Sequence, residues 1–536
     1  MLLIHPALTP APLVNVEVTV AKSEAATGPW RIALGTADRI VRPFARDATG
    51  DIEVSVTIAG PGVELHLART PTGPVTLAYA VLAGREAPDD PTGVAVLDDR
   101  FRGAGERLLA LPAGAEDTRG TILVRIDGEA LRASGAASSL GVGAARRAAL
   151  APRALRYATF LAGSLGVEVI DDPGAGHDEA AWLGYTDFDP RPAVADLSQV
   201  RTALRELLAS HDDPGVWTYL LVAQTRPMGW FRTTPRTGSV LVQVGPSEPW
   251  SAPLRLSVAQ QLARRWIGGE LRVQTDAGHE GEGLWFGEGV SRYVAMAALS
   301  RLGMLTPDEV RNAVAGELSV LATSPDRTLP NARLAELAQT DEVARATLMA
   351  RGAVYALRES AVMRAHTKGE RGLTSALVLL VKQAEEGKPG AFAVPAWVDA
   401  IGKADPNAAR IFDAYIVRGD PIALPGDALG PCFRSGNGEY VAFDPGFDLD
   451  ATRASRDGKV VGVRPDGPAA KAGLKDGDVV ESMQAREGDG TAPVKIVVTR
   501  DGAPATIAYV PRGARGRGQT WTRVPGASDD RCGQLP

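Results

Sequence analysis

The period of the hydrophobic residues changes along the chain, and this change constrains the fold more strongly than any other sequence feature. Between residues 14 and 132, apolar side chains recur at every second position, as they do in residues 52–58. This period is typical of half-buried antiparallel strands. From residue 144 to about residue 417, apolar residues are mostly spaced three and four apart, which is typical of amphipathic helices. The sequence therefore predicts a multidomain α+β protein that begins with a β-sandwich-like domain.

The length of the chain predicts several domains, because 536 residues are too many for one hydrophobic core. We expect an N-terminal β-domain over residues 1–143 and a mixed α+β domain over residues 144–303. A helical domain over residues 304–430 and a small β-domain over residues 431–536 follow.

Within the middle of the chain, local patterns predict individual elements. Residues 144–161 and 200–210 have helical spacing, whereas residues 219–223 and 240–244 are short apolar runs suited to strands. Residues 306–309, Thr-Pro-Asp-Glu, predict a helix start with an N-terminal capping box and a proline at the first helical position.

Charge and hydropathy exclude some classes of partner. The formal net charge is -6, whereas a surface that binds nucleic acid normally carries a basic excess. No run of 18 or more apolar residues is present, so we expect no membrane-spanning helix. The first twelve residues lack a basic leader and contain three prolines, so they make a poor secretory signal. We therefore expect a cytoplasmic protein, or a periplasmic or secreted one from which a signal was trimmed.

The two cysteines, Cys432 and Cys532, lie at the two ends of the C-terminal segment. A disulfide between them would close a long loop in an oxidising compartment. Two free thiols are the alternative, and the sequence leaves both possibilities open.

Two neighbouring segments carry the candidate site. Gln260 to Arg264, with the sequence Gln-Gln-Leu-Ala-Arg, lies in a stretch with helical spacing, and Glu288 lies in segment 284–293, after Trp-Phe-Gly. Zinc peptidases place H-E-x-x-H on one helix and a third ligand, a Glu, on the next. Here the Glu is present, and both histidines and the catalytic Glu are absent.

Other short motifs follow in an order that identifies a family resemblance. They are Phe-Arg-Gly at 101–103, Leu-Ala-Leu-Pro at 109–112, Leu-Thr-Pro-Asp-Glu at 305–309, Tyr-Ile-Val-Arg-Gly at 415–419 and the Gly-rich segment 467–480. With these motifs and segment 284–293 in this order, the chain resembles the PDZ-carrying glycyl aminopeptidase family of gluzincin metallopeptidases. The resemblance implies a thermolysin-like gluzincin α+β domain, a helical domain and a C-terminal PDZ-like β-domain. Because only a short loop, residues 481–493, is available where the PDZ helix is expected, we expect this domain to have a reduced groove.

At the metal site the chain departs from this family. The resemblance places Gln260 and Arg264 at the two histidine positions and Gln261 at the general base. A Gln carbonyl is a weak zinc ligand, a guanidinium offers no lone pair, and a neutral amide cannot accept a proton at neutral pH. With Glu288, these residues are vestigial active-site positions, so we expect no functional catalytic residue, no metal and no other cofactor. We further expect Arg264 to pair with Glu288, or each side chain to be solvated separately.

Two further departures concern the substrate. The segment that holds the substrate's amino terminus in related enzymes looks like residues 228–232, which contain no carboxylate, and the oxyanion Tyr looks like Met349, ahead of Arg351 and Gly352. Candidate residues that line the cleft are the aromatic Trp230, Phe231, Trp266, Trp285 and Tyr293.

These departures favour a non-catalytic pseudopeptidase that acts as a peptide- or protein-binding scaffold. The alternative is a metal-dependent aminopeptidase with an altered zinc site, including one rebuilt around His279, Glu280 and Glu282. A purely structural partner in an envelope assembly is a third possibility. The sequence identifies neither the partner nor the oligomeric state.

Overall fold

The computed structural model describes residues 1–9, 11–21, 28–84, 90–97, 99–172, 176–184, 189–210, 216–223, 231–245, 248–386, 390–455, 457–485, 488–529, 532 and 535. The chain divides into two compact units. The first comprises Met1–Ala195, Pro214–Glu248 and Arg453–Gly458, and the second comprises Asp196–Asp213, Pro249–Thr452 and Lys459–Pro536.

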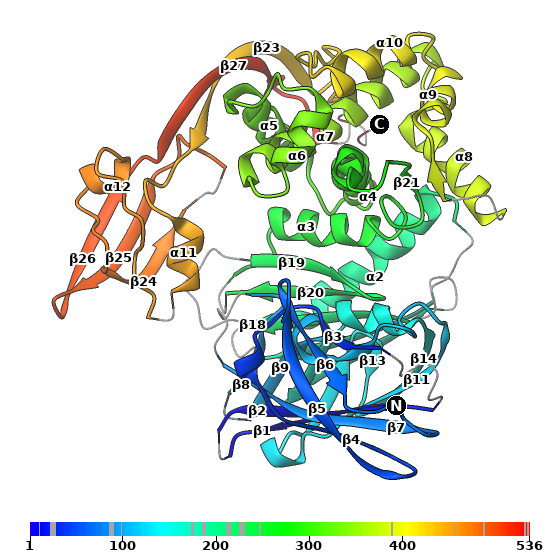
Figure 1. Cartoon of the computed structure of the whole chain (residues 1–536). Helices are drawn as coiled ribbons and strands as arrows, with labels where there is room; N and C mark the ends of the chain where they lie inside the picture. Colours follow the sequence, from blue (N-terminus) through cyan, green and yellow to red (C-terminus); the bar gives the residue numbers. More distant parts are fainter. Residues whose placement is uncertain are drawn as a thin grey trace. The chain divides into compact units, whose positions relative to one another are not determined.

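The first unit is built from three β-sheets (Figure 1). The ten-stranded sheet contains, in spatial order, β10 (Leu111–Pro112), β3 (Trp30–Ile32), β6 (Gly62–Leu67), β5 (Gly50–Ala59), β4 (Ile40–Asp47), β7 (Val75–Leu82), β2 (Leu13–Val20), β1 (Leu2–Ala7), β11 (Gly120–Ile126) and β14 (Ala145–Leu150). The first five-stranded sheet contains β13 (Gly141–Val142), β12 (Gly135–Ser138), β15 (Thr159–Gly163), β9 (Arg100–Ala104) and β8 (Val94–Leu97). The other contains β16 (Gly166–Asp172), β17 (Gly176–Leu183), β18 (Val216–Ala223), β20 (Ser239–Val244) and β19 (Phe231–Arg236).

The alternation seen in the sequence matches the burial of these strands. In β2, Val14, Val16 and Val18 are buried, and the residues between them are not. Strand side chains point alternately to opposite faces, so one face joins the hydrophobic core. The strands predicted at residues 219–223 and 240–244 are confirmed as β18 and β20.

The helix predicted over residues 144–161 is wrong. Strand β14 pairs antiparallel with β11, and β15 pairs antiparallel with β9. Alanine and arginine are good helix formers, but intrinsic propensities differ by less than about 1 kcal/mol per residue, so pairing with strands distant in sequence outweighs the local preference. The sheets therefore extend past residue 143, where we expected the β-domain to end.

The second unit is mainly helical. It contains α3 (Ala252–Ala263), α4 (Ser291–Arg301), α5 (Pro307–Thr323), α6 (Asn331–Leu337), α7 (Glu342–His366), α8 (Leu373–Glu385), α9 (Val394–Gly402) and α10 (Ala408–Phe412). Two π-helical turns adjoin these helices. The turn η6 (Trp285–Val290) continues into α4, and η7 (Asp413–Val417) directly follows α10. The predicted capping box is confirmed, because Thr306 and Glu309 bond each other's backbone N–H groups. The helix predicted at residues 200–210 corresponds to the second half of α2 (Pro190–Leu207), which ends before residue 208.

Aromatic packing and a close backbone approach hold η6 against α7. Trp285 makes edge-to-face contacts with Tyr355, Trp397 and Phe412 at centroid distances of 6.0, 5.7 and 5.3 Å. A Cβ at Gly352 of α7 would lie 2.0 Å from the Trp285 carbonyl oxygen. Only glycine therefore allows the two backbones to approach this closely.

The C-terminal part of the second unit contains a small sheet and a two-stranded ribbon. Strands β24 (Val479–Gln484), β25 (Val494–Arg500) and β26 (Ala503–Tyr509) form an antiparallel sheet, accompanied by the short helices α11 (Leu449–Ala454) and α12 (Pro468–Lys471). The ribbon pairs β23 (Phe433–Phe443) with β27 (Arg512–Arg523) (Figure 1). We did not predict the ribbon, because its Gly- and Arg-rich strands lack apolar alternation. The PDZ-like character of this part remains a prediction.

A disulfide joins Cys432 and Cys532 next to the ribbon, across a sequence separation of 100 residues. In the chain-entropy description, closing a loop of this length stabilises the folded state by about 4 to 5 kcal/mol. Of the two possibilities left open by the sequence, the structure shows the disulfide.

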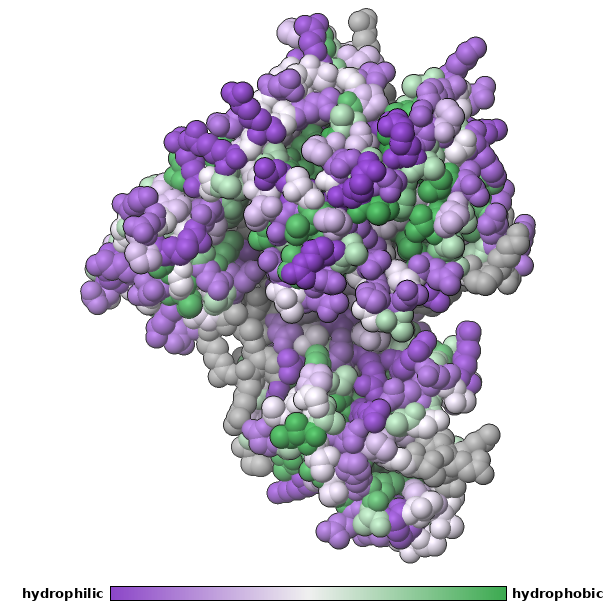
Figure 2. Space-filling model, turned by 45° about the horizontal axis from the view of Figure 1, so that its top comes forward, coloured by the Kyte–Doolittle hydropathy of each residue, from purple (hydrophilic) through white to green (hydrophobic). Residues whose placement is uncertain are grey.

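Hydrophilic side chains predominate on the face of the molecule shown in Figure 2, and hydrophobic ones form small scattered patches. Among the described helices, none combines the length and the hydropathy needed to cross a membrane.

Two Gly→Ala substitutions, one at the contact between η6 and α7 and one at an open position of α5, should change the stability in opposite directions. Gly352→Ala forces a Cβ into the Trp285 carbonyl and should lower the free energy of unfolding by about 1–3 kcal/mol. Gly316→Ala in α5, where no atom lies within 4 Å of the added Cβ, should raise it by about 0.5–1 kcal/mol. Urea unfolding measures both, and equal effects of the two substitutions would contradict the close approach.

Candidate functional site

Helix α3 places the first two candidate residues. The helix begins at the N-cap Ser251, whose side chain accepts a hydrogen bond from the Leu254 N–H. Gln260 and Arg264 are four residues apart, so they lie on one face of the helix. Gln260 is only 6% exposed, and its Nε2 donates a hydrogen bond to the Glu288 backbone oxygen at 3.0 Å. The Gln260 amide therefore links α3 directly to η6.

The π-helical turn η6 places Glu288. Single π-helical turns within α-helices occur frequently at functional sites. Glu288 is 4% exposed. A Cβ at Gly268, after α3, would lie 2.8 Å from the Gly287 Cα, so glycine at this position allows the chain to pass close to η6.

Glu288 is paired with two guanidinium groups. Arg264 Nη2 lies 3.7 Å from Glu288 Oε1, which agrees with the expected pair. Arg345 Nη2, from α7, donates a hydrogen bond to the same oxygen. Arg345 could not be predicted from the sequence, because it is 57 residues from Glu288 and lies on a helix without any recognisable site motif. We call Glu288, Arg264, Arg345, Gln260 and Gln261 the Glu288 cluster.

The Glu288 cluster carries more positive than negative charge. Burial lowers the pKa of Arg264 most strongly, the Glu288 carboxylate opposes this effect, and the nearby Arg345 adds to it. Arg264 Nη1 also donates to Gln261 Oε1 at 3.3 Å. Both arginine side chains are about one-third exposed, at 31% and 39%, so the positive groups face solvent while the carboxylate does not.

A neighbouring ion pair joins α4 to α5. Arg292 Nε lies 3.1 Å from Glu317 Oε1, and Arg292 Nη1 lies 3.5 Å from Gln260 Oε1. The amide oxygen of Gln260 therefore already faces a cation.

Three aromatic residues that we expected to line a cleft are instead buried in the core. Trp266 and Trp285 are 1% exposed and Tyr293 is 0% exposed. Large aromatic rings at helical spacing contribute more by filling the interior, and the Trp285 contacts described above show this packing. Phe231 lies in β19 of the first unit and is half-buried, and Trp230 lies outside the described residues.

The segment considered for a rebuilt metal site is a short 3₁₀ helix, η5 (Glu280–Gly283), preceded by His279. His279 and Glu280 are exposed. Among the described residues, no group of three or more His, Cys, Asp or Glu side chains is placed to hold a metal ion.

The positions compared with the oxyanion motif lie on α7. Met349 is half-buried, and Arg351 is only 1% exposed. Arg351 Nη2 donates to the backbone oxygens of Arg327 and Leu329 at 3.1 and 2.8 Å. Arg351 is therefore directed toward the 327–329 loop.

Comparison with solved structures identifies the fold. An aminopeptidase N family protein from Idiomarina loihiensis is similar over 100% of both chains, with a TM-score of 0.70 and 17% sequence identity. Native yeast LTA4 hydrolase has a TM-score of 0.50 and 10% identity, covering 79% of this chain and 68% of that chain. An M1 zinc metallopeptidase from Deinococcus radiodurans has a TM-score of 0.47 and 15% identity over 79% of this chain and 94% of that one. The full-length match shows that this chain has the fold of an aminopeptidase N family protein.

No protein-family model matches the sequence, and no match was found among curated proteins.

The sequence resemblance to gluzincin metallopeptidases raises the question whether the Glu288 cluster could hold a zinc ion. Zinc in peptidases takes two histidine nitrogens and a carboxylate. Here Glu288 is the one carboxylate of the cluster, and both Arg264 and Arg345 approach it. A guanidinium has no lone pair, and two of them would repel a divalent cation. The residues present do not fit a zinc ion.

The shared carboxylate predicts that the effects of the two arginines are not additive. Arg264→Met or Arg345→Met alone should lower the free energy of unfolding by about 1 kcal/mol, because one cation still compensates Glu288. The double variant should lose about 3 kcal/mol or more, because the buried carboxylate is then unpaired.

Urea unfolding of the single and double variants measures this coupling. Arg333→Met is the matched control, because Arg333 forms an exposed pair with Glu336 within one helix and should change stability by less than about 0.5 kcal/mol. Additive losses in the double variant would contradict a shared carboxylate.

Proposed function

We propose that this protein is a non-catalytic pseudopeptidase of the glycyl aminopeptidase type that acts as a peptide- or protein-binding scaffold. The observation that carries the proposal is the pairing of Glu288 with Arg264 and Arg345. The two guanidiniums supply the positive charge that a metal ion would otherwise supply to a buried carboxylate. The helices of a peptidase are thereby held together without the ion.

The chemistry of the remaining residues supports the same proposal. Hydrolysis by a zinc peptidase needs a base that takes a proton from the attacking water. Gln261 is at the position of that base, and its neutral amide cannot accept a proton at neutral pH. Its Oε1 instead accepts a hydrogen bond from Arg264. Gln260, Gln261, Arg264 and Glu288 are thus vestigial positions in this proposal.

The rest of the chain is assigned roles that fit a scaffold. The 431–536 segment is proposed to be a PDZ-like domain with a reduced groove, which favours packing or protein contact over capture of a peptide end. The Cys432–Cys532 disulfide is compatible with an oxidising compartment, and we propose a periplasmic or secreted location. The partner is a peptide or protein whose identity remains open.

Metal analysis together with a peptidase assay tests the absence of catalysis. The purified protein is expected to contain zinc well below one ion per chain and to release no product from Gly- or Ala-aminoacyl substrates. Elemental analysis by mass spectrometry and a chromogenic assay give the two readouts. Stoichiometric zinc with turnover would establish the alternative, a metal-dependent aminopeptidase with an altered site.

A restoration experiment tests whether the metal site was lost through these particular residues. The triple variant Gln260→His, Gln261→Glu, Arg264→His introduces the H-E-x-x-H motif and keeps the ion pair between Arg345 and Glu288. We expect the quadruple variant with Arg345→Leu to bind zinc at least about tenfold more tightly than the triple variant, because the competing cation is removed.

Competition with a chromophoric chelator measures the two affinities. Adding Arg333→Leu to the triple variant gives the control, since Arg333 pairs with Glu336 and not with Glu288. If the quadruple variant binds zinc no better than the triple variant, Arg345 is not what excludes the ion.

A further inference from the structure

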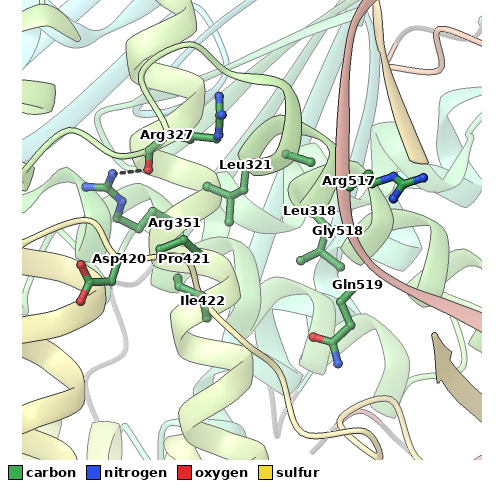
Figure 3. A pocket seen from close by; sticks show the side chains of 11 residues that line it. Leu318, Leu321, Arg327, Arg351, Asp420, Pro421, Ile422, Arg517, Gly518 and Gln519 are labelled. Atoms are coloured by element: carbon green, nitrogen blue, oxygen red, sulfur yellow. Dashed lines mark hydrogen bonds between the residues drawn. The ribbon is translucent and has the colours of Figure 1, made fainter. Parts of the chain in front are cut away.

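Helix α7 buries two charged side chains that lie outside the Glu288 cluster, Arg351 and Glu359. Arg351 borders a cavity of about 120 Å³ between α5 and β27 (Figure 3), and its Nη2 donates to the backbone oxygens of Arg327 and Leu329. Desolvation lowers the pKa of Arg351 only to about 10, so this group keeps its charge at neutral pH. Glu359, two turns further along the helix, has different surroundings.

Two buried carboxylates share one guanidinium at this part of α7. Arg358 Nη1 lies 2.6 Å from Glu359 Oε1 and 3.4 Å from Asp405 Oδ2. Glu359 is 0% exposed and Asp405 is 1% exposed. When both carboxylates are ionised, this group of three side chains carries one excess negative charge in the interior, which is costly to a folded protein. A single proton on either carboxylate removes the excess charge.

The hydrogen bonds of the two carboxylates favour Glu359 as the site of that proton. Asp405 lies in the turn between α9 and α10, where its Oδ1 accepts a hydrogen bond from the Asn407 N–H at 2.9 Å and its Oδ2 faces Arg358. Glu359 Oε1 accepts from Arg358, whereas Oε2 is buried and has no hydrogen-bond partner among the described residues. Hydrogen bonds to a carboxylate favour its charged form, so Asp405 keeps its charge more readily than Glu359.

The pKa of Glu359 agrees with this assignment. Burial raises the pKa to about 7, the charge and hydrogen bond of Arg358 oppose this rise, and the charge of Asp405 adds to it. Glu359 therefore changes its charge near neutral pH.

The remaining titratable groups around the pair come from α7 and η7. Tyr355, one turn before Glu359, stays neutral, because burial and then the Glu359 charge raise its pKa well above the ordinary value. The ring of Tyr415 in η7 lies 5.8 Å from the Arg358 guanidinium. His366 contacts a backbone oxygen of the α9–α10 turn through Nδ1 at 3.1 Å. Both the neutral and the protonated imidazole can donate this bond.

We propose that Glu359, Arg358 and Asp405 form a pH-sensitive switch between α7 and the α9–α10 turn. With a proton on Glu359, Arg358 pairs with Asp405 and holds the turn against α7. Loss of the proton leaves two carboxylates that compete for one cation, and their repulsion loosens the turn. The switch shares no residue with the Glu288 cluster and does not depend on the proposed function.

The switch is connected to the aromatic packing around η6. Trp397 of α9 and Phe412 of α10 contact Trp285 at centroid distances of 5.7 and 5.3 Å. Trp397 Nε1 also donates to the Tyr355 hydroxyl at 3.3 Å. The protonation of Glu359 is therefore linked to the side chains that hold η6 in place.

Urea unfolding of the full-length protein as a function of pH tests the switch. Because the pKa of Glu359 rises from the ordinary 4.5 to about 7 on folding, the proton stabilises the folded state at low pH, and this stabilisation is lost as the pH rises through 7. Glu359→Gln cannot ionise. The folding equilibrium constant of the unmodified protein, divided by that of the variant, should fall at least about tenfold between about pH 5 and about pH 8.

Glu336→Gln is the matched control, because Glu336 is exposed and pairs with Arg333 within one helix. For this variant the same ratio should change by less than about twofold over the pH range.

Hydrogen exchange locates the change in the chain. After correction for the pH dependence of the intrinsic rate, amide exchange in α9 and α10 should increase at least about threefold between about pH 6 and about pH 8 in the unmodified protein. In Glu359→Gln the corrected exchange of these helices should stay constant. Helix α5 is the reference segment and should show no such increase in either protein.

Asp405→Asn gives a second test that keeps an acceptor for the Asn407 N–H. Removing the competing charge should move the loss of stability to lower pH by about half a unit or more, and this variant decides the question if Glu359→Gln does not fold. The proposal is overturned if the ratio for Glu359→Gln stays within about twofold across the pH range, if the corrected exchange of α9 and α10 is independent of pH, or if Asp405→Asn leaves the pH profile unchanged.

Discussion

The buried carboxylate of Glu288 is the interaction on which the arrangement of the peptidase-like helices depends. An ionised carboxylate in the interior costs several kcal/mol unless a cation compensates it. Arg264 follows α3 directly and Arg345 belongs to α7, so the one carboxylate on η6 connects three helices. Gln260 strengthens the same connection through its bond to the Glu288 backbone oxygen.

Packing around η6 makes the positions of these groups independent of a bound ion. Trp285 is enclosed by aromatic rings from α7, α9 and α10, and Gly352 allows the α7 backbone to approach η6 closely. These contacts are apolar and steric, so they add to the ionic link at Glu288 and do not require a bound ion. The contacts around η6 therefore support this fold with amide and guanidinium side chains next to Glu288.

Two arginines of helix α7, Arg345 and Arg351, differ in their exposure and in the partners of their guanidinium groups. Arg345 is about one-third exposed and pairs with a carboxylate. Arg351, six positions later, is buried and bonds to backbone oxygens, which are dipoles without a full charge. The first arginine completes a site that the sequence already indicated. The second marks a cavity that no sequence motif indicated, because it is formed by segments that are distant along the chain.

The sequence alone determined the features that depend on neighbouring residues: the alternating strands, the capped start of α5 and the presence of Gln260 and Arg264, one helical turn apart, at the end of α3. Only the tertiary structure decided that residues 144–161 contain strands, that Trp285 fills the core, and that Arg345 reaches Glu288. These features depend on partners dozens of residues away, and local propensities of a few tenths of a kcal/mol cannot outweigh strand pairing and core burial. Period and spacing encode the local elements, and long-range packing selects which of their side chains meet.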